Sequence, residues 1–596
     1  MPTSPVAPIP PRPAARGRRR GALALLIMLI APAAAGAATV EGPADPLFHL
    51  VPPDASAVLA VEDLRARIRQ VEAWPLAADL GKSPLVAATL ASDRAGRFRR
   101  AMAGVEAALG VPIRAVVDDI LGDAVVLALK ADPRDPVDRS SGLLLIRPRQ
   151  RKFLEQLLDG RNRAQARRGR LAEVVAKPRG TTTYQSRRFR PGQGAGDYYA
   201  FLDDGTFAWS NSESMLGEVI DRRAGGRPGW DSSPGFARLR AGLPGQALAS
   251  LHVAPGFAAR VLDLTKGGPL APPHYARKVV ASYLEAVAAI GFALEWRDGP
   301  VLHAHDVLDP ARVPPWLAAW IRLPMRPAPL LDRVPPTALG VVAARFDFGA
   351  ALRAGRSLVE ESDRATWEAA EQVATGLLGG RPADEFLDKV DPHVVLALTP
   401  RAAPDSWRWF GVAGGATWRD PGEADAAWPA VDNAVRTGMA IRALWWSSEG
   451  RPARVATRPV AGRPVTTLGP PDRPILAAQV GPDRLLVADD PAALAQFGAA
   501  GGSPAGSTWE ELRAKHAADC DTFAVFDLLR VVDTVGRSRP AIVAELAART
   551  SRPAAEVERD LDQVLALARL FRGVVLTARV GPDSTEIHRT IGLIAR

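Results

Sequence analysis

The sequence predicts an α+β protein made of two tandem copies of a mostly antiparallel sheet. We expect helices packed on one face of each sheet and a pseudo-two-fold relation between the copies. Matching segments recur in the same order in both halves of the chain. Strand-like segments are joined by short turns, which indicates hairpins and antiparallel pairing. Helices fall between hairpins and do not alternate singly with strands, which argues against a doubly wound parallel sheet.

Residues 1–37 have the pattern of a secretory signal peptide. The basic segment Arg16–Arg20 precedes the apolar run Ala22–Ile30 and then the small residues Ala33–Ala38. Cleavage after Ala37 fits this order. The alternative is an uncleaved membrane anchor, but the apolar run is about ten residues and a spanning helix needs about 20. We therefore predict export to the periplasm or the cell surface.

Each copy is expected to open with a strand and to continue through a helix end into a second strand. Val51–Ala60 (VPPDASAVLA) matches Val334–Ala343 (VPPTALGVVA). Leu109–Leu129 aligns without gaps with Leu378–Leu398, and both segments end in an identical VVLAL strand. A shared order of strand, helix end and strand indicates an internal repeat.

Two further hairpins follow in each copy, and the first of them leads into a helix with a capping signal. In the first copy the cap is expected from Asn211 and Ser212. In the second copy it is expected from Asp489 and Asp490, which Pro491 follows. The expected hairpin strands are Tyr198–Leu202 with Thr206–Ser210, Ile475–Val480 with Leu485–Ala488, Phe292–Trp296 with Val301–His305, and Val574–Arg579 with Thr585–Arg589.

The Pro-rich segment Leu323–Leu330 separates the copies and resists regular structure. The sequence thus divides into a signal peptide at 1–37, a first domain at 41–322, a connector at 323–330 and a second domain at 331–596.

These motifs resemble those of a family of exported bacterial proteins catalogued only as a domain of unknown function. The resemblance is carried by the VPP[DT]A strand, the LGDAVVLAL segment and the hairpin–helix unit that ends in Ser210–Leu216 (SNSESML). It implies export and no known activity.

Composition excludes several classes of protein. The formal net charge of +10 includes arginines of the N-terminal segment, so the mature chain is only weakly basic. A nucleic-acid-binding protein needs a concentrated basic face, and we predict no nucleic-acid partner. The single cysteine, Cys520, excludes an intramolecular disulfide and a cysteine-based zinc site.

No catalytic or cofactor motif is present. A G-x-S-x-G nucleophile elbow is absent, and Gly81-Lys82-Ser83 lacks the earlier glycine that a phosphate loop requires. His303 and His305 alternate on one strand and share a face, as two metal ligands would. We place His588 at the position equivalent to His303 and find no third ligand, so we predict structural histidines, no metal site and no effect of chelators on thermal stability.

Two groups of side chains suggest surface contacts. One is an arginine-rich group that would bind anions such as an envelope polyanion; the alternative is a solvated loop. It consists of Arg161, Arg163, Arg167, Arg168, Arg170, Arg187, Arg188 and Arg190. The other is Trp445-Trp446, which we expect on a strand with the rings on opposite faces. Trp316 and Trp320 are expected to share a helix face near the connector.

The function we predict is a non-enzymatic, exported cell-envelope binding or scaffolding module. Its partner would be an envelope polyanion or another envelope protein, and membrane contact would occur only through an uncleaved N-terminus. Two alternatives remain open, namely a hydrolase-like enzyme of unrecognised type with a site between the repeats, and a membrane-tethered accessory protein.

Overall fold

A computed structural model describes residues 44–596 apart from short gaps. The gaps are 83–85, 87–90, 93–94, 97–98, 101–102, 104–105, 108–110, 122, 133–139, 194–195, 226, 246, 265–273, 402–407, 461, 471–473, 500–505 and 582. The predicted signal peptide at 1–37 lies outside the described residues.

The described strands form one mixed helix-and-sheet fold around a single 20-stranded sheet. The strands of the N-terminal half are β1 (Ala57–Glu62), β2 (Ala124–Lys130), β3 (Ser141–Arg147), β4 (Leu171–Arg179), β5 (Thr182–Phe189), β6 (Asp197–Phe201), β7 (Phe207–Ser210), β8 (Ala249–Val253), β9 (Val287–Trp296) and β10 (Pro300–Leu308). Those of the C-terminal half are β11 (Gly340–Arg345), β12 (His393–Pro400), β13 (Phe410–Thr417), β14 (Arg454–Val460), β15 (Arg463–Gly469), β16 (Leu476–Val480), β17 (Arg484–Ala488), β18 (Thr522–Asp527), β19 (Phe571–Val580) and β20 (Glu586–Ala595).

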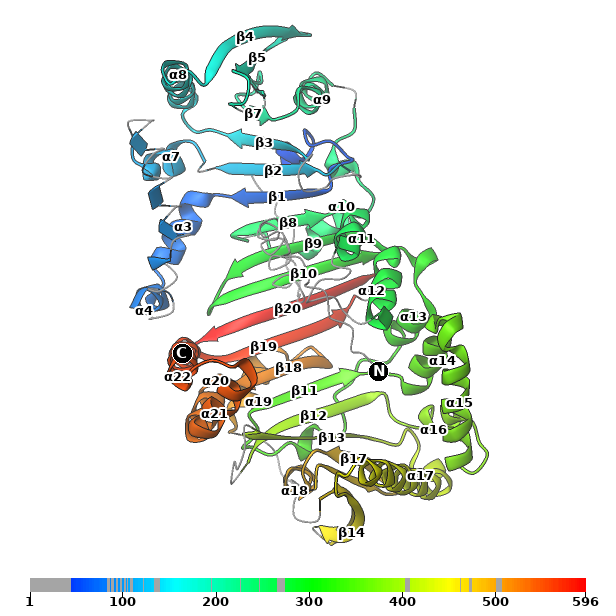
Figure 1. Cartoon of the computed structure of the whole chain (residues 1–596). Helices are drawn as coiled ribbons and strands as arrows, with labels where there is room; N and C mark the ends of the chain where they lie inside the picture. The colour runs from blue at the N-terminus through cyan, green and yellow to red at the C-terminus, as the bar shows by residue number, and fades with distance from the viewer. Residues whose placement is uncertain are drawn as a thin grey trace, which may run out of the picture.

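Every ladder between these strands is antiparallel, and the ladders join them into one continuous series. From one edge, the order is β4-β5-β6-β7-β3-β2-β1-β8-β9-β10. From the other edge, it is β14-β15-β16-β17-β13-β12-β11-β18-β19-β20. The two series meet where β10 pairs with β20, near the middle of the sheet (Figure 1).

The helices flank this sheet along its whole length (Figure 1). Those of the first half are α2 (Asp45–Phe48), α3 (Leu64–Glu72), α4 (Pro75–Lys82), α7 (Ile113–Asp119), α8 (Arg151–Arg167), α9 (Glu213–Arg223), α10 (Phe236–Gly242), α11 (Pro255–Leu264), α12 (His274–Ala286) and α13 (Pro315–Ile321). Those of the second half are α14 (Phe348–Leu358), α15 (Glu361–Leu377), α16 (Ala383–Leu387), α17 (Pro421–Ser448), α18 (Pro491–Ala499), α19 (Thr508–His516), α20 (Leu528–Arg537), α21 (Arg539–Thr550) and α22 (Ala554–Ala568).

The prediction that helices cover one face of the sheet is wrong. On β3, Leu143 and Leu145 pack in the cluster that contains Met215 of α9. Ile146, the residue after Leu145, packs in the cluster that contains Leu154 of α8. Alternate residues of a strand point to opposite faces, so α9 and α8 lie on opposite faces of the sheet. The same arrangement recurs in the second half, where Leu486 of β17 packs with α18 and the neighbouring Leu485 packs with α17.

The hairpins expected from the sequence are confirmed. β6 pairs with β7, β16 with β17, β9 with β10, and β19 with β20. Ser212 caps α9 by accepting a hydrogen bond from the backbone amide of Met215, and Asp490 accepts one from the amide of Ala492 at the start of α18. Short turns and side-chain caps are local, which is why the sequence pattern identifies them.

Trp445 and Trp446 do not lie on a strand, as predicted, but in the last turns of the 28-residue helix α17. The helix places Met439, Ala443 and Trp446 against Leu468 and Ala478 of the sheet. This three-to-four-residue spacing produces a helical stripe, which outweighs the preference of aromatic residues for strands. Trp445 is therefore 51% exposed at the end of the helix.

The halves also meet through the connector. Within Leu323–Leu330, which carries no helix or strand, Ala328 and Leu330 are buried in the core of the second half. The indole of Trp320, on α13, donates a hydrogen bond to the backbone carbonyl of Arg345 at the end of β11. Among the described helices, none combines the length and the apolar character that a bilayer crossing demands.

Candidate functional site

The arginines of the expected anion-binding patch do not form one surface. Six are exposed at the end of α8 and around β4 and β5, namely Arg163, Arg167, Arg168, Arg170, Arg188 and Arg190. Among these six, Arg188 pairs with Glu173 at 2.7 Å, and Arg161 is half-buried. The exposed guanidinium groups keep the anion-binding prediction open.

Arg187 does not belong to the predicted anion-binding patch, because it is buried. Its side chain is 1% exposed and forms two hydrogen bonds with the carboxylate of Asp197, at 2.9 and 2.8 Å. Its Nε donates to Asn162 of α8 at 2.9 Å. A buried guanidinium with these partners fastens α8 to β5 and β6, and it cannot reach an anion in solvent.

The middle of the sheet instead presents a row of apolar side chains on one face. Among the described strand residues, the large exposed apolar side chains are Leu127 (45%), Leu294 (37%), Leu396 (40%) and Val487 (42%). Residues directly opposite each other in a ladder share a face. The ladder partners of these residues show which of them belong together.

Leu294, Leu396 and Val487 belong to one unbroken row of cross-strand partners, which we call the apolar stripe. In order from β9 to β17 it consists of Leu294, Leu302, Ile591, Leu576, Ala524, Val342, Leu396, Gly414 and Val487. Nine neighbouring strands at about 4.8 Å spacing make the stripe roughly 38 Å long. Apart from Gly414, none of its residues is fully buried.

Leu127 lies on the same face, outside the stripe. It pairs with Leu59 of β1, which pairs with Leu251 of β8, and this residue pairs with Phe292, two positions from Leu294. Leu127 and Leu396 occupy the same place in the two VVLAL segments. A leucine that is exposed in both segments is a feature of the surface, since a core position would be covered.

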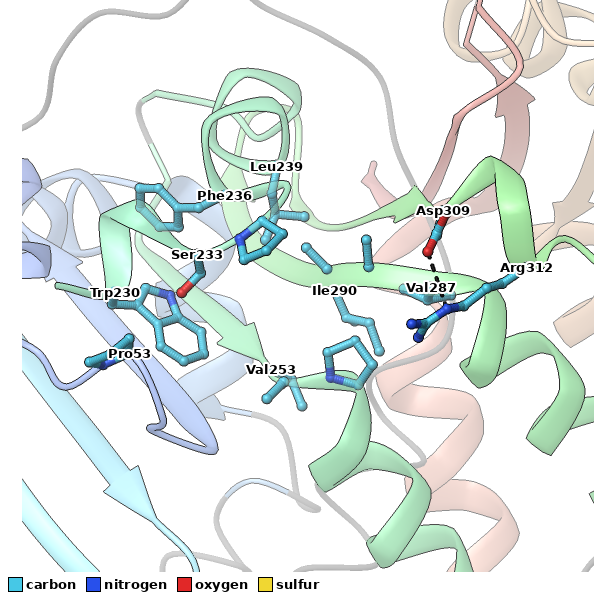
Figure 2. A pocket seen from close by; sticks show the side chains of 15 residues that line it. Pro53, Trp230, Ser233, Phe236, Leu239, Val253, Val287, Ile290, Asp309 and Arg312 are labelled. Carbon is cyan, nitrogen blue, oxygen red and sulfur yellow. Dashed lines mark ion pairs between the residues drawn. The ribbon is translucent and has the colours of Figure 1, made fainter. Parts of the chain in front are cut away.

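A separate pocket of about 430 Å³ lies beside α10, β8 and β9. Its walls are mostly apolar, with Trp230, Phe236 and Ile290 around it (Figure 2). Its ionisable lining residues are Asp309 and Arg312, which pair with each other at 3.2 Å (Figure 2). The pocket therefore offers apolar burial and no free acid–base pair.

Three potential metal ligands meet where β10 pairs with β20. His305 lies directly opposite His588, and their rings stack at 4.1 Å between centroids and 16° between planes. The carboxylate of Glu586 lies 3.4 Å from Nε2 of His305 and 3.3 Å from Nε2 of His588. The ligand atoms of the three residues all lie within 4.8 Å of one another. We call these three residues the junction cluster.

The cluster is buried on the histidine side and open on the glutamate side. The side chains of His305 and His588 are 0% and 8% exposed, whereas that of Glu586 is 21% exposed. Burial lowers the pKa of His588 to about 3, with the neighbouring His305 and Arg579 adding to the effect. Burial also lowers the pKa of His305. Both imidazoles are therefore neutral at physiological pH.

The opposite face of the same ladder carries a polar network that joins the halves. Arg589 forms an ion pair with Asp306 and donates a hydrogen bond to the hydroxyl of Tyr283 at 2.7 Å. Tyr283 also donates a hydrogen bond to Asp306. Burial raises the pKa of Tyr283, so its hydroxyl keeps the proton that this contact uses. The junction thus has polar contacts on both faces of the sheet.

The sequence reasoning missed this cluster because it identified no third ligand beside His303 and His305 and treated His588 as the repeat equivalent of His303. In the ladder, His303 lies opposite Thr590, and its Nε2 contacts Glu295 at 2.9 Å. The third residue of the cluster, Glu586, lies two positions before His588. The sequence signals for this cluster were the His-x-His pattern of His303 and His305 and the Glu-x-His pattern of Glu586 and His588. Nothing in either pattern says that these two strands pair.

Comparisons with known proteins identify no relative of this chain. No protein-family model, no curated protein and no solved structure matches the chain.

Proposed function

We propose that this protein is a non-enzymatic, exported binding module that engages an apolar partner in the cell envelope through the apolar stripe. The single observation that carries the proposal is the row of incompletely buried aliphatic side chains from Leu294 to Val487, which is interrupted only by Gly414. Exposed apolar area of this extent is unfavourable in water and typically marks an interaction site. Export rests on the signal-like pattern of residues 1–37.

We further propose that the two halves are copies of one unit. Their strands follow the same pairing order, counted from β4 and from β14. The sequence match sets Val58 on Val341 and Ala128 on Ala397, and each of these residues is paired with the other member of its own half. Agreement of ladder register with an alignment made from the sequence supports a duplication. An experimental structure with different neighbours for Leu127 and Leu396 would contradict it.

The apolar partner we favour is another envelope protein with an aliphatic face. The stripe carries no charged side chain, so it offers nothing to a polyanion, and its length crosses both halves of the sheet. A second copy of the chain or an acyl chain are the competing occupants, and the test below distinguishes them.

The test measures binding of the dye 1-anilinonaphthalene-8-sulfonate to the purified chain and photo-crosslinking in cells. Leu294→Asn, Leu396→Asn and Val487→Thr are combined, and Leu546→Asn with Val564→Thr serves as the control, because those two residues are exposed by 40% and 56% on α21 and α22. We expect the stripe variant to lose most of the dye fluorescence and the control to keep it. Equal fluorescence in both variants would contradict the proposal.

The crosslinking arm identifies the occupant. A photo-reactive residue at position 396 should give one discrete adduct with a different protein, whereas the same residue at position 546, where the leucine is equally exposed at 40%, should give none. Adducts only with a second copy of the chain, or only with lipid, would show that the stripe binds that occupant. Either result would contradict the proposal that it binds a different protein.

A further inference from the structure

The last two turns of α17 carry apolar side chains that the rest of the protein leaves uncovered. Ile441, Leu444 and Trp445 are exposed by 51%, 72% and 51%. Their spacing of three and four residues sets them side by side on one face of the helix. Within the described part of the chain, Leu444 is the most exposed large apolar side chain. We call these three residues the helix-end patch.

The helix-end patch takes no part in the core contact of α17. Met439, Ala443 and Trp446 pack in one cluster with Leu468 and Ala478 of the sheet. Successive helix residues are about 100° apart around the axis, so the patch residues point away from this contact. Figure 1 shows α17 near the end of the sheet that β14 closes, opposite β4. Exposed apolar side chains gathered on one outward face indicate a contact outside this chain.

A guanidinium group lies at the rim of the patch. The guanidinium carbon of Arg442 is 3.9 Å from the ring centroid of Trp445 and 4.8 Å from that of Trp446. No carboxylate of the described residues pairs with Arg442. The two indole rings therefore hold this charge beside the patch, with its hydrogen-bonding groups open to a ligand.

The carboxylates nearest to the patch along the chain already have cationic partners. Asp432 pairs with Arg436 at 2.8 Å, and Glu449 pairs with Arg451 at 3.6 Å. These pairs cancel, so the charge of Arg442 remains unmatched. The surface around the patch thus complements an anion.

A phospholipid surface fits this combination better than a second protein does. Stable protein interfaces bury about 800 Å² on each partner, and three side chains at the end of one helix supply much less. A membrane needs no matching shape. Aliphatic side chains enter the boundary of its acyl chains, tryptophan lies at the level of the head groups, and arginine extends towards the phosphates.

We propose that Ile441, Leu444 and Trp445 insert into the interfacial layer of an anionic phospholipid membrane, and that Arg442 contacts a head-group phosphate. This contact is separate from the partner on the apolar stripe. It also differs from the sequence-based expectation, in which membrane contact occurs only through an uncleaved N-terminus.

The test places a fluorescent label beside the patch and asks whether vesicles bury it. In the full chain, Cys520→Ser removes the single cysteine and Ser448→Cys introduces one on the outward face, one turn beyond Leu444. Leu546→Cys, at a position exposed by 40% on α21, is the control. With vesicles of phosphatidylglycerol and phosphatidylethanolamine, we expect a several-fold rise of nitrobenzoxadiazole fluorescence at position 448 and none at position 546. Lipids brominated in the upper acyl chain should quench the label at position 448.

Substitutions in the labelled chain assign the effect to the patch. Leu444→Gln with Trp445→Gln should abolish the rise, whereas Leu444→Ile with Trp445→Phe should keep it. Both pairs change exposed side chains, so equal melting temperatures verify that the fold is retained. Arg442→Gln should weaken the affinity for these vesicles by about fivefold, the effect of one basic residue near an anionic surface.

Three results would overturn the proposal: no vesicle response at position 448, an equal response at position 546, or an equal response in the glutamine pair. A rise that needs no vesicles and grows with protein concentration would identify a second copy as the occupant, and would also contradict it. The combined stripe variant should keep the vesicle response. Failure of this inference can therefore be told apart from failure of the proposed function.

Discussion

At the scale of single residues, burial decides which charges matter. Arg187 and Arg188 are neighbours on β5, yet one is buried against Asp197 and the other pairs with Glu173 in solvent. The charges of Arg187 and Asp197 are shielded from water and contact each other, whereas those of Arg188 and Glu173 remain hydrated. The chain has many arginines, and the fold alone separates the structural ones from the surface ones.

Removing one member of each pair should therefore have unequal effects on stability. We expect Asp197→Ala to lower the free energy of unfolding by about 3–5 kcal/mol, because it leaves the Arg187 charge buried without a partner. Glu173→Ala, the control on the exposed pair, should cost at most about 1 kcal/mol. Urea unfolding followed by circular dichroism measures both, and comparable losses would show that Arg187 is hydrated.

His252 should make stability depend on pH. It lies between Phe48 and Phe236, with ring centroids at 5.3 and 5.5 Å, and burial lowers its pKa to about 3. Below about pH 6.5 the unfolded chain binds a proton that the folded ring does not, so stability is lost as the pH falls from 6.5 towards 3. Between pH 7 and 5 this residue should cost about 2 kcal/mol.

The measurement is urea unfolding at pH 7 and pH 5 for three proteins. His252→Phe fills the same space with a side chain that does not titrate, so it should lose less stability than the wild type over that interval. His49→Gln, at an exposed position, should follow the wild type. Identical losses in the wild type and His252→Phe would mean that the native ring is accessible to protons.

At the scale of elements, α17 shows how a helical stripe prevails over local composition. Two adjacent tryptophans suggested a strand, but Met439, Ala443 and Trp446 recur at helical spacing and pack on β15 and β16. A 28-residue helix satisfies its own backbone, and its apolar stripe supplies the tertiary contacts. The two tryptophans therefore lie in different surroundings on one helix.

The helix predicts opposite outcomes for two alanines three residues apart. Ala443 is 7% exposed, whereas Ala440 is exposed. Ala443→Arg should destabilise the protein by about 2 kcal/mol or more, because it forces a charge into the contact with Leu468. Ala440→Arg should change stability by no more than about 0.5 kcal/mol. Thermal unfolding compares the two, and a larger loss in Ala440→Arg would contradict the helix orientation.

At the scale of the whole molecule, the pairing of β10 with β20 makes one sheet from two. Each of these strands has a partner on both sides, whereas β4 and β14 close the series with one partner each. Unpaired strand edges invite association with other chains, and here the two inner edges cover each other. The ladder also brings together the three residues of the junction cluster and makes the apolar stripe continuous.

Hydrogen exchange should report this arrangement. We expect the amides of β10 and β20 to exchange as slowly as those of β1, because all three strands are paired on both sides. Peptides from the edge strands β4 and β14 should exchange fastest among the strands. Exchange of β10 and β20 at the rate of β4, measured by mass spectrometry on the full chain, would show that the halves separate in solution.

The local features of this protein follow from the sequence alone. Hairpins such as β6–β7 and β16–β17, the cap at Ser212 and the α+β class depend on neighbouring residues, and the order of matching segments predicts the same strand sequence twice. Helix placement was predicted less well, since the sequence pattern does not say that α8 and α17 cover the face opposite α9 and α18.

The tertiary structure alone decided what lies at the centre of the sheet. His305 and Glu586 are 281 positions apart, and no periodicity or spacing says which strand edges of two similar halves will meet. That choice depends on which edges remain uncovered after each half has packed its helices, and it is made by long-range burial. The junction cluster and the continuous stripe exist only as a consequence of that one ladder.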